Sequence, residues 1–258
     1  MVTLTINGKI VQAQDGEYLL SVLRREKIDV PTLCHHDAVE PSGACRLCVV
    51  EVTKADWDGW CDYVTSCLYP VANGLIINTH APKVIELRKS ILDLFLARHP
   101  QSIEIKEMAA EYGILQTQYE VVVDGNNCIL CGLCTRICDA MGFEAISTVG
   151  RGHGKEVAPP LNLAPPDCVG CLACAKNCPT NFIEYTESEN NLEIWNKKFD
   201  LITCKECGKS GITKIFAEHL SIDRDIPIEY FEKCDLCHRK ELTSTMGKIA
   251  NWEREAKA

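Results

Sequence analysis

The chain has 258 residues, 46% of them hydrophobic, and a formal net charge of -9. That acidic balance argues against nucleic acid as a partner. The longest apolar stretches, such as residues 91–97, are too short to cross a bilayer, so we expect no membrane insertion. The 17 cysteines fall in metal-ligand spacings and no secretion signal precedes them, which predicts a cytoplasmic protein.

The first predicted elements are a β-hairpin and a helix. Two segments that alternate apolar and polar residues, 2–6 and 9–13, are joined by Asn7-Gly8, a pair suited to a type I′ turn. Residues 17–27 follow with an apolar face at helical spacing. A hairpin followed by a helix is typical of a β-grasp fold.

The next feature is a group of cysteines, in which Cys34, Cys45 and Cys48 have the spacing C-x10-C-x2-C. This spacing keeps the close pair of the plant-type 2Fe-2S signature and widens its first gap. The segments Pro-Thr-Leu-Cys-His at 31–35 and Gly-Ala-Cys-Arg-Leu-Cys-Val-Val-Glu-Val at 43–52 resemble a known ferredoxin domain. That domain begins the large iron-sulfur subunit of respiratory complex I, FeFe hydrogenases and the small diaphorase subunit of NAD-linked hydrogenases.

The resemblance implies a 2Fe-2S cluster with a fourth cysteine ligand, for which there are two candidates. Cys61 lies nearer the spacing usual in the family, whereas Cys67 is followed by Leu-Tyr-Pro-Val-Ala-Asn-Gly, the context of the family's final cysteine. We select Cys67 and interpret residues 54–62 as a hairpin insertion, which leaves Cys61 as a free thiol.

The middle of the chain is predicted to be a helical linker. Residues 82–98 have the pattern of a helix, 103–112 of a second short helix, and 119–123 of a strand. In complex I and many FeFe hydrogenases the equivalent first helix leads to a cluster with one histidine and three cysteine ligands. His99 has the position of that histidine, but no cysteine follows until Cys128. We therefore predict that this cluster is absent and that His99 is a structural or surface residue.

Two runs of C-x2-C-x2-C-x3-C follow, and this spacing is typical of a ferredoxin with two 4Fe-4S clusters. A pair of zinc ribbons would leave the third cysteine of each run unexplained. In such ferredoxins the fourth cysteine of each run binds the other cluster. One 4Fe-4S cluster is therefore assigned to Cys128, Cys131, Cys134 and Cys178, and the other to Cys168, Cys171, Cys174 and Cys138.

Between the two runs lies a glycine-rich segment, residues 150–155. It lacks the pattern of a phosphate loop, and the prolines at 159–160 prevent a helix from following it directly. We interpret it as a hairpin or loop that connects the two halves of the ferredoxin. No dinucleotide fingerprint occurs elsewhere, so NAD and flavin are expected on another chain.

The C-terminal part contains two C-x2-C knuckles about 26 residues apart, a pairing typical of a four-cysteine metal site. Zinc and a further iron-sulfur cluster are both compatible with this pattern. His219 and His238 are expected outside the ligand set, and residues 241–258 to form an amphipathic or loosely ordered helix. The predicted ligands are Cys204, Cys207, Cys234 and Cys237.

The predicted architecture is α+β, with four parts in sequence. They are a β-grasp 2Fe-2S ferredoxin domain (1–80), a helical linker (81–120), a bacterial-type ferredoxin domain with two 4Fe-4S clusters (121–190), and a four-cysteine module that resembles a zinc ribbon or binds a cluster (191–258).

Many redox centres without a substrate site indicate an electron-transfer subunit of a multi-subunit oxidoreductase, a function typical of anaerobic metabolism. Its expected partners are a subunit that binds flavin and NAD(P) and a catalytic metal subunit such as a hydrogenase or a formate dehydrogenase. The alternative is a free-standing ferredoxin that shuttles among enzymes. A third hypothesis, a metal-dependent regulator that binds nucleic acid, conflicts with the acidic balance.

Overall fold

The structure is a computed structural model that describes residues 1–122 and 126–255. The chain forms two compact units, each built from several segments. The first unit comprises Met1–Gly142, Ser147–Ala158 and Cys174–Ile183, and the second comprises Phe143–Ile146, Pro159–Ala173 and Glu184–Ala258. Each unit is described by itself.

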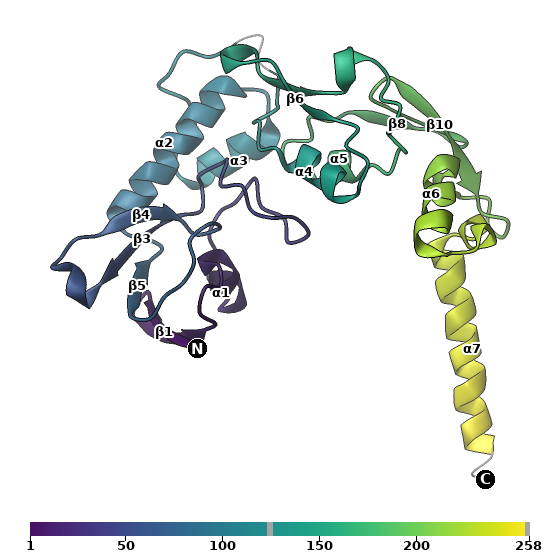
Figure 1. Ribbon diagram of the computed structural model, residues 1–258, viewed down its shortest axis with the longest axis horizontal. Coiled ribbons are helices and arrows are strands. Elements are labelled where there is room, and N and C mark those ends of the chain that lie inside the picture. The colour runs from purple at the N-terminus through teal and green to yellow at the C-terminus, as the bar shows by residue number, and fades with distance from the viewer. Residues whose placement is uncertain (123–125, 256–258) are drawn as a thin grey trace. The chain divides into compact units, whose positions relative to one another are not determined.

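The first unit begins with a five-stranded mixed sheet (Figure 1). β1 and β2 pair as the predicted hairpin, and positive φ angles at Asn7 and Gly8 suit a type I′ turn. β5 pairs parallel to β1 and antiparallel to β3, and β4 pairs antiparallel to β3. The order across the sheet is β2 (Lys9–Ala13), β1 (Val2–Ile6), β5 (Leu75–Asn78), β3 (Val49–Lys54) and β4 (Asp62–Thr65).

Helix α1 (Leu19–Arg25) supplies the other half of this module's core. It is shorter than predicted, and its N-cap residue Tyr18 makes no side-chain cap hydrogen bond. The helix buries leucine and valine side chains that belong to one hydrophobic cluster with the sheet. Members of that cluster include Leu4, Ile6, Leu19, Leu20, Leu23, Val50, Val52, Leu75 and Ile77.

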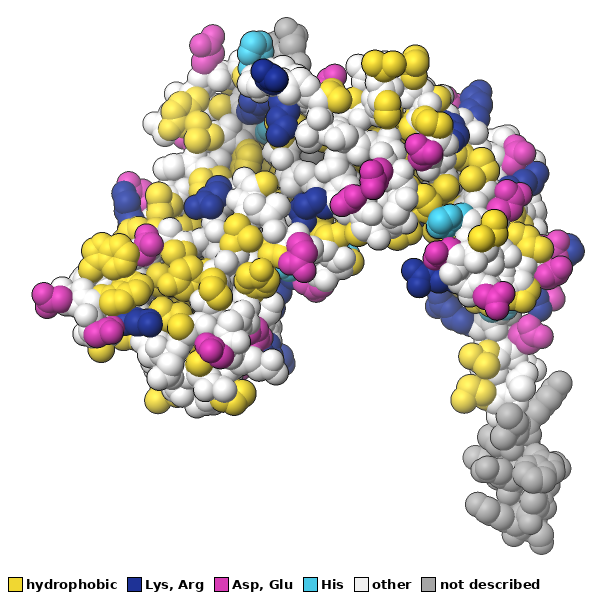
Figure 2. Space-filling view, viewed as in Figure 1, with side chains coloured by type: hydrophobic (Ala, Val, Ile, Leu, Met, Phe, Trp, Pro, Cys, Tyr) yellow, Lys and Arg dark blue, Asp and Glu magenta, His cyan; other side chains and the backbone are white. Residues whose placement is uncertain are grey.

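The residues interpreted as an insertion form the connection between β3 and β4. A short 3-10 helix η1 (Ala55–Trp57) is followed by positive φ angles at Asp58 and Gly59, which turn the chain back. Trp60 is 57% exposed, and its ring centroid lies 5.0 Å from that of Trp57. Hydrophobic side chains gather over this part of the module in Figure 2.

Two helices follow, α2 (Pro82–Arg98) and α3 (Ile103–Glu111), as the sequence predicts. Arg88 on α2 is buried and donates a hydrogen bond to the Val49 carbonyl at 2.8 Å, which holds the helix against β3. Ser102 caps α3 by accepting from the Ile105 amide. The predicted strand at 119–123 is wrong for 119–122, which form no strand, and Val123 lies outside the described residues.

The first unit also contains α4 (Leu133–Ala140) and a two-stranded sheet of β6 (Ser147–Val149) and β7 (Glu156–Ala158). The two strands pair antiparallel around the 3-10 helix η2 (Gly152–Gly154). The glycine-rich segment is therefore the turn of a hairpin, as predicted. The short helix α5 (Ala173–Lys176) carries the third cysteine of the second run.

The second unit contains a four-stranded antiparallel sheet and the last helices. Its core includes Leu192, Ile194, Phe199, Leu201 and Ala217. The elements in chain order are η3 (Pro160–Asn162), β8 (Tyr185–Glu187), β9 (Asn191–Ile194), β10 (Lys197–Thr203), β11 (Ser210–Thr213), α6 (Lys214–Arg224), η4 (Ile228–Glu232) and α7 (Asp235–Glu255).

The predicted C-terminal helix is present within α7, although its last residues, 256–258, lie outside the described residues. Among the helices of the described residues, none combines the length and apolar character that crossing a membrane requires.

Candidate iron-sulfur and metal centres

The first group of thiols is formed by Cys34, Cys45, Cys48 and Cys67, and all four are buried. Loops that flank α1 and the β3–β4 hairpin bring them together: Cys48 directly precedes β3, and Cys67 lies just after β4. The thiols form two hydrogen-bonded pairs, Cys34 with Cys45 and Cys48 with Cys67. Cys34 also raises the pKa of Cys48 and Cys67 through its charge, so the two pairs are close to each other.

Within each pair the hydrogen bond favours one thiolate. The bond from Cys45 lowers the pKa of Cys34 to about 5, and the bond from Cys67 lowers that of Cys48 to about 7. The same bonds raise the pKa of Cys45 and Cys67, and burial adds to that rise. Thiolates are the form that binds metal, and these hydrogen bonds favour the thiolate at Cys34 and at Cys48.

Backbone amides point at these sulfurs. The amide of Leu33 donates to the Cys45 sulfur, and the amide of Cys45 donates to the Cys34 sulfur, both at 3.4 Å. Gly43 has a φ of +64°, and an added Cβ would collide with the Leu68 side chain, so the loop needs glycine there. Amide hydrogen bonds to sulfur are one of the factors that set the potential of an iron-sulfur cluster.

Cys61 lies apart from this group. It is partly exposed on the β3–β4 connection, where its thiol donates to the Tyr63 hydroxyl at 3.8 Å. Tyr63 in turn donates to Glu51 at 3.1 Å. Of the two candidates for the fourth ligand, the structure brings Cys67 and not Cys61 beside Cys48.

The second group of thiols is Cys128, Cys131, Cys134 and Cys178, which line one hollow in the first unit. The hollow is closed by apolar residues, among them Val157 and Ile183. Burial raises the pKa of Cys131 to about 11 and of Cys134 to about 12, and neighbouring cysteines add to the rise. Such thiols stay protonated alone and become thiolates when a cationic iron centre binds, so this donor set fits a cluster.

His99 is buried, with 2% of its surface exposed, so it is structural and does not lie on the surface. Its Nδ1 lies 2.7 Å from the Asn126 carbonyl. Because a carbonyl only accepts, Nδ1 carries the proton. Burial lowers the pKa of His99, which keeps the ring neutral at neutral pH. The ring therefore braces the segment that leads into Cys128.

The remaining cysteines of the two runs fall in both units: Cys138 and Cys174 in the first, Cys168 and Cys171 in the second. In the second unit, Lys197 donates to three carbonyls, those of Pro165, Pro166 and Cys168, at 2.7–3.0 Å. The Lys197 side chain, from β10, therefore holds in place the loop that carries Cys168. The sequence alone did not identify this lysine.

The two runs share a backbone conformation. In the first run, Leu130 and Gly132 have positive φ angles of 53° and 66°. In the second run, Gly170 and Leu172 hold the same two positions, with φ angles of 70° and 61°. A leucine in the left-handed region is strained, so its occurrence once in each run indicates that both loops must adopt the same shape.

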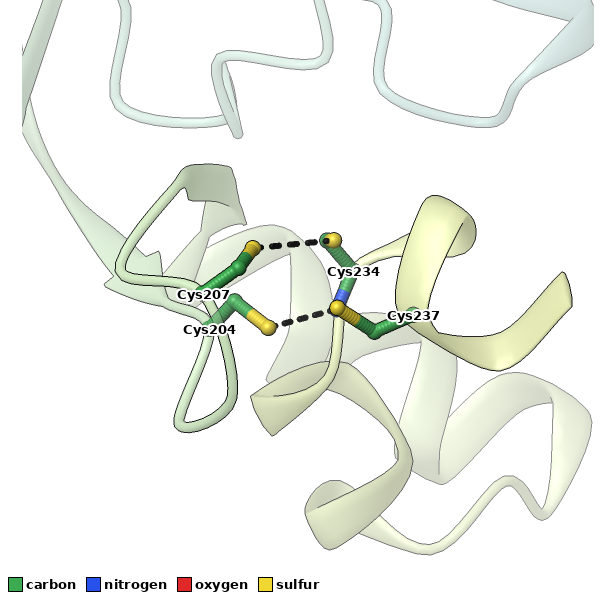
Figure 3. Close-up of side chains that lie close together, drawn as sticks. All are labelled: Cys204, Cys207, Cys234 and Cys237. Atoms are coloured by element: carbon green, nitrogen blue, oxygen red, sulfur yellow. Dashed lines mark hydrogen bonds between the residues drawn. The ribbon is translucent and has the colours of Figure 1, made fainter. Parts of the chain in front are cut away.

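The C-terminal cysteines Cys204, Cys207, Cys234 and Cys237 come together, with their sulfurs all within 4.8 Å of one another (Figure 3). The first two follow β10, and the other two lie at the start of α7. The Cys234 amide donates to the Cys204 sulfur at 3.3 Å, and this bond lowers the pKa of Cys204 to about 6. The Cys207 and Cys234 sulfurs are 3.6 Å apart.

This spacing fits one tetrahedral ion. Four sulfurs bound to a single zinc at about 2.3 Å lie about 3.8 Å from each other. In a 4Fe-4S cluster each thiolate binds a different iron, which requires wider separation. The two histidines near this module make other contacts: His238 stacks on Tyr230 with centroids 4.3 Å apart, and His219 packs edge-on against Phe143.

Comparison with known protein families identifies the class of domain to which these centres belong. Residues 1–82 match the family model of the 2Fe-2S iron-sulfur cluster binding domain, and residues 121–185 match that of the 4Fe-4S dicluster domain. The chain therefore combines both kinds of iron-sulfur domain, as its cysteine motifs predicted.

Its relatives include subunits of large redox enzymes. The NADP-reducing hydrogenase subunit HndD of Solidesulfovibrio fructosivorans is 29% identical over 70% of this chain and 35% of that protein. The mitochondrial NADH-ubiquinone oxidoreductase 78 kDa subunit of Neurospora crassa is 27% identical over 60% of this chain and 24% of that protein. The chain thus spans about a third or less of the length of these curated relatives.

A solved structure shares the fold. A chain of an NAD+-reducing [NiFe]-hydrogenase in the H2-reduced state superposes with a TM-score of 0.60 at 23% identity. The match covers 70% of this chain and 86% of that one. The resemblance to iron-sulfur subunits of hydrogenases and complex I is confirmed by these relatives together with the two domain matches.

Proposed function

We propose that this protein is an electron-transfer subunit of a cytoplasmic multi-subunit oxidoreductase. It passes single electrons between a subunit that binds flavin and NAD(P) and a catalytic metal subunit, for which hydrogenase and formate dehydrogenase are the candidate types. The observation that carries this proposal is that the two cysteine runs have the same loop conformation. Two loops of the same shape can bind two clusters of the same kind in one chain. The relatives named above, which are subunits of larger enzymes, favour this function over a free-standing ferredoxin.

The proposed centres are one 2Fe-2S cluster, two 4Fe-4S clusters and one zinc ion. A β-grasp domain holds the first, on Cys34, Cys45, Cys48 and Cys67. The 4Fe-4S ligands are Cys128, Cys131, Cys134 and Cys178 for one cluster and Cys168, Cys171, Cys174 and Cys138 for the other. The zinc ligands are Cys204, Cys207, Cys234 and Cys237, and their close sulfur spacing supports a single ion over a further cluster.

When bound, the clusters accept and release electrons one at a time, so the chain can divide a two-electron hydride reaction into single steps. The protein's own residues bind and bury the clusters and set their potentials. Leu33 and Cys45 direct amide hydrogen bonds at the sulfurs of the first group. Val157 and Ile183 line the hollow of the second group and limit the access of water.

The test is anaerobic affinity purification of the tagged protein from its own cells. We expect about ten irons and one zinc per chain, and recovery of a flavoprotein and a catalytic metal subunit identified by mass spectrometry. A chain with fewer than about five irons would disprove the proposed set of clusters. Recovery of a fully loaded protein with no other subunit would instead support the free-standing ferredoxin.

A further inference from the structure

Arg136 connects two groups of cysteine ligands that are far apart in sequence. It lies on α4, between Cys134 and Cys138 of the first run. Its Nη2 donates to the carbonyl of Cys34 at 2.7 Å, and its Nη1 donates to the carbonyl of Glu40 at 2.6 Å. One guanidinium therefore joins the loop of the first 2Fe-2S ligand to the helix that carries a 4Fe-4S ligand.

Within residues 1–122 and 126–255, no ion pair joins Arg136 to a carboxylate. Both of its NH2 groups bond to neutral carbonyls, and its Nε is buried without a hydrogen-bond partner among the described residues. The nearby Arg24 pairs with Asp37 at 2.8 Å, so that acid is already engaged.

A partly buried cation without a counter-ion is costly, and this cost requires an explanation. Clusters bound by thiolates carry negative charge, and a cluster on the Cys34 group would supply an anion near the guanidinium. Arg136 lies beside the Cys34 loop and on the helix that carries Cys134.

We propose that Arg136 is a positioning residue for electron transfer between the 2Fe-2S centre and the 4Fe-4S centre of Cys128, Cys131, Cys134 and Cys178. Its two hydrogen bonds hold the Cys34 loop against α4, and its positive charge beside that loop would favour the reduced form of the 2Fe-2S centre. In the transfer one electron leaves the reduced centre and enters the oxidised one, and no bond or proton changes. This inference rests on the proposed function, because it assumes that both groups of thiols hold clusters.

The experiment compares Arg136→Met, Arg136→Lys and the wild-type protein, all purified without oxygen. Each centre is titrated by electron paramagnetic resonance against potential, and transfer between centres is followed by freeze-quench after photochemical reduction. The control is Arg151→Met, which removes an exposed arginine in the β6–β7 hairpin of the same unit. Photochemical reduction requires no partner subunit, so the result does not depend on finding one.

Arg136→Met is expected to keep its iron, to make the 2Fe-2S potential more negative and to slow the transfer. A tenfold change in the reduction equilibrium corresponds to about 59 mV for one electron. Lysine keeps the positive charge but lacks the planar guanidinium that makes two hydrogen bonds at once. Arg136→Lys is therefore expected to have the wild-type potential at the 2Fe-2S centre but slower electron transfer. Arg151→Met is expected to match the wild type in both.

Unchanged potentials and unchanged transfer in Arg136→Met would overturn the proposal. If Arg136→Met does not retain iron, Arg136→Lys provides the test. A purely structural arginine would leave both the potential of the 2Fe-2S centre and the rate of electron transfer unchanged in the folded lysine variant. Absence of clusters from the wild-type protein would instead refute the proposed function, so the two failures are distinguishable.

Discussion

The N-terminal module and the C-terminal module hold four cysteines each in different ways. In the first, Cys48 and Cys67 belong to a hydrophobic cluster that the sheet and α1 complete. In the second, Cys207 is exposed, and the residues around the site, such as Lys205 and Glu232, are polar and exposed or partly exposed. The first site is thus built into a core, whereas the second joins the loop after β10 to the start of α7, next to the core of the second unit.

This difference indicates which interactions stabilise each module. A module with its own apolar core can remain folded without its metal, because burial of apolar surface supplies the main driving force. Segments that a metal joins obtain much of their folding free energy from the metal itself. Loss of metal should therefore have different consequences at the two sites.

The largest effect is expected from removing the C-terminal metal. Structural zinc contributes about 10–16 kcal/mol of binding free energy in small zinc modules, so a zinc chelator or Cys234→Ser should release η4 and the start of α7 from the loop after β10. Hydrogen exchange measures the loss of amide protection there, while β1–β5 should stay protected. Protection of η4 and the start of α7 that survives removal of the metal would show that other contacts hold these segments.

The N-terminal module is expected to lose its cluster without losing its fold. Cys67→Ser should abolish or perturb the 2Fe-2S paramagnetic signal alone, with the amides of β1 and β5 still protected from exchange. Cys61→Ser is the matched control, since Cys61 lies on the β3–β4 connection and bonds to Tyr63. A signal that depends on Cys61 instead would make our choice of the fourth ligand wrong.

The core of the N-terminal module can be weakened directly by Leu20→Ala. Leu20 is 1% exposed within the cluster formed by α1 and the sheet. The cavity should cost about 2–5 kcal/mol of unfolding free energy in that module. Native-state hydrogen exchange is the suitable measurement, because a chain of several modules is not two-state. An equal loss of protection in β9 and β10 would contradict the independence of the two modules.

The smallest effects are expected at two helix caps. Ser102 caps α3 in the first unit, and Thr213 caps α6 in the second by accepting from the Phe216 amide at 3.2 Å. Each alanine substitution should cost about 1 kcal/mol. Thr213→Ala should cost more, because that hydroxyl also donates to the Val169 carbonyl at 2.5 Å. Equal losses of amide protection in α3 and α6, measured by native-state hydrogen exchange, would show that the second bond contributes nothing.

The cysteine groups were predictable from sequence because their spacings are short and local. The knuckles of Cys204 and Cys234 each require only a tight loop, and the sequence already implied that the two would meet. The hairpin at Asn7-Gly8 was predictable for the same reason, because both residues tolerate positive φ. Local backbone chemistry determines these features.

Features that depend on tertiary contacts could not be predicted. Arg136 reaches a carbonyl 102 residues away, and Lys197 caps a loop about 30 residues upstream. A cationic side chain in a polar sequence context gives no sign of such a role. The predicted strand is wrong for 119–122, where the Val122 amide bonds to the Ala97 carbonyl at the end of α2 and not to a neighbouring strand.

The β10–β11 hairpin has a consequence for how the protein matures. Its open end holds the loop that bears Cys168 and Cys171, through Lys197 and Thr213. Its other end carries the knuckle of Cys204. A chain that acquires its C-terminal ion first would present an ordered loop to the machinery that inserts iron and sulfide. On the proposed assignment of zinc and clusters, the supply of one metal would govern the loading of another.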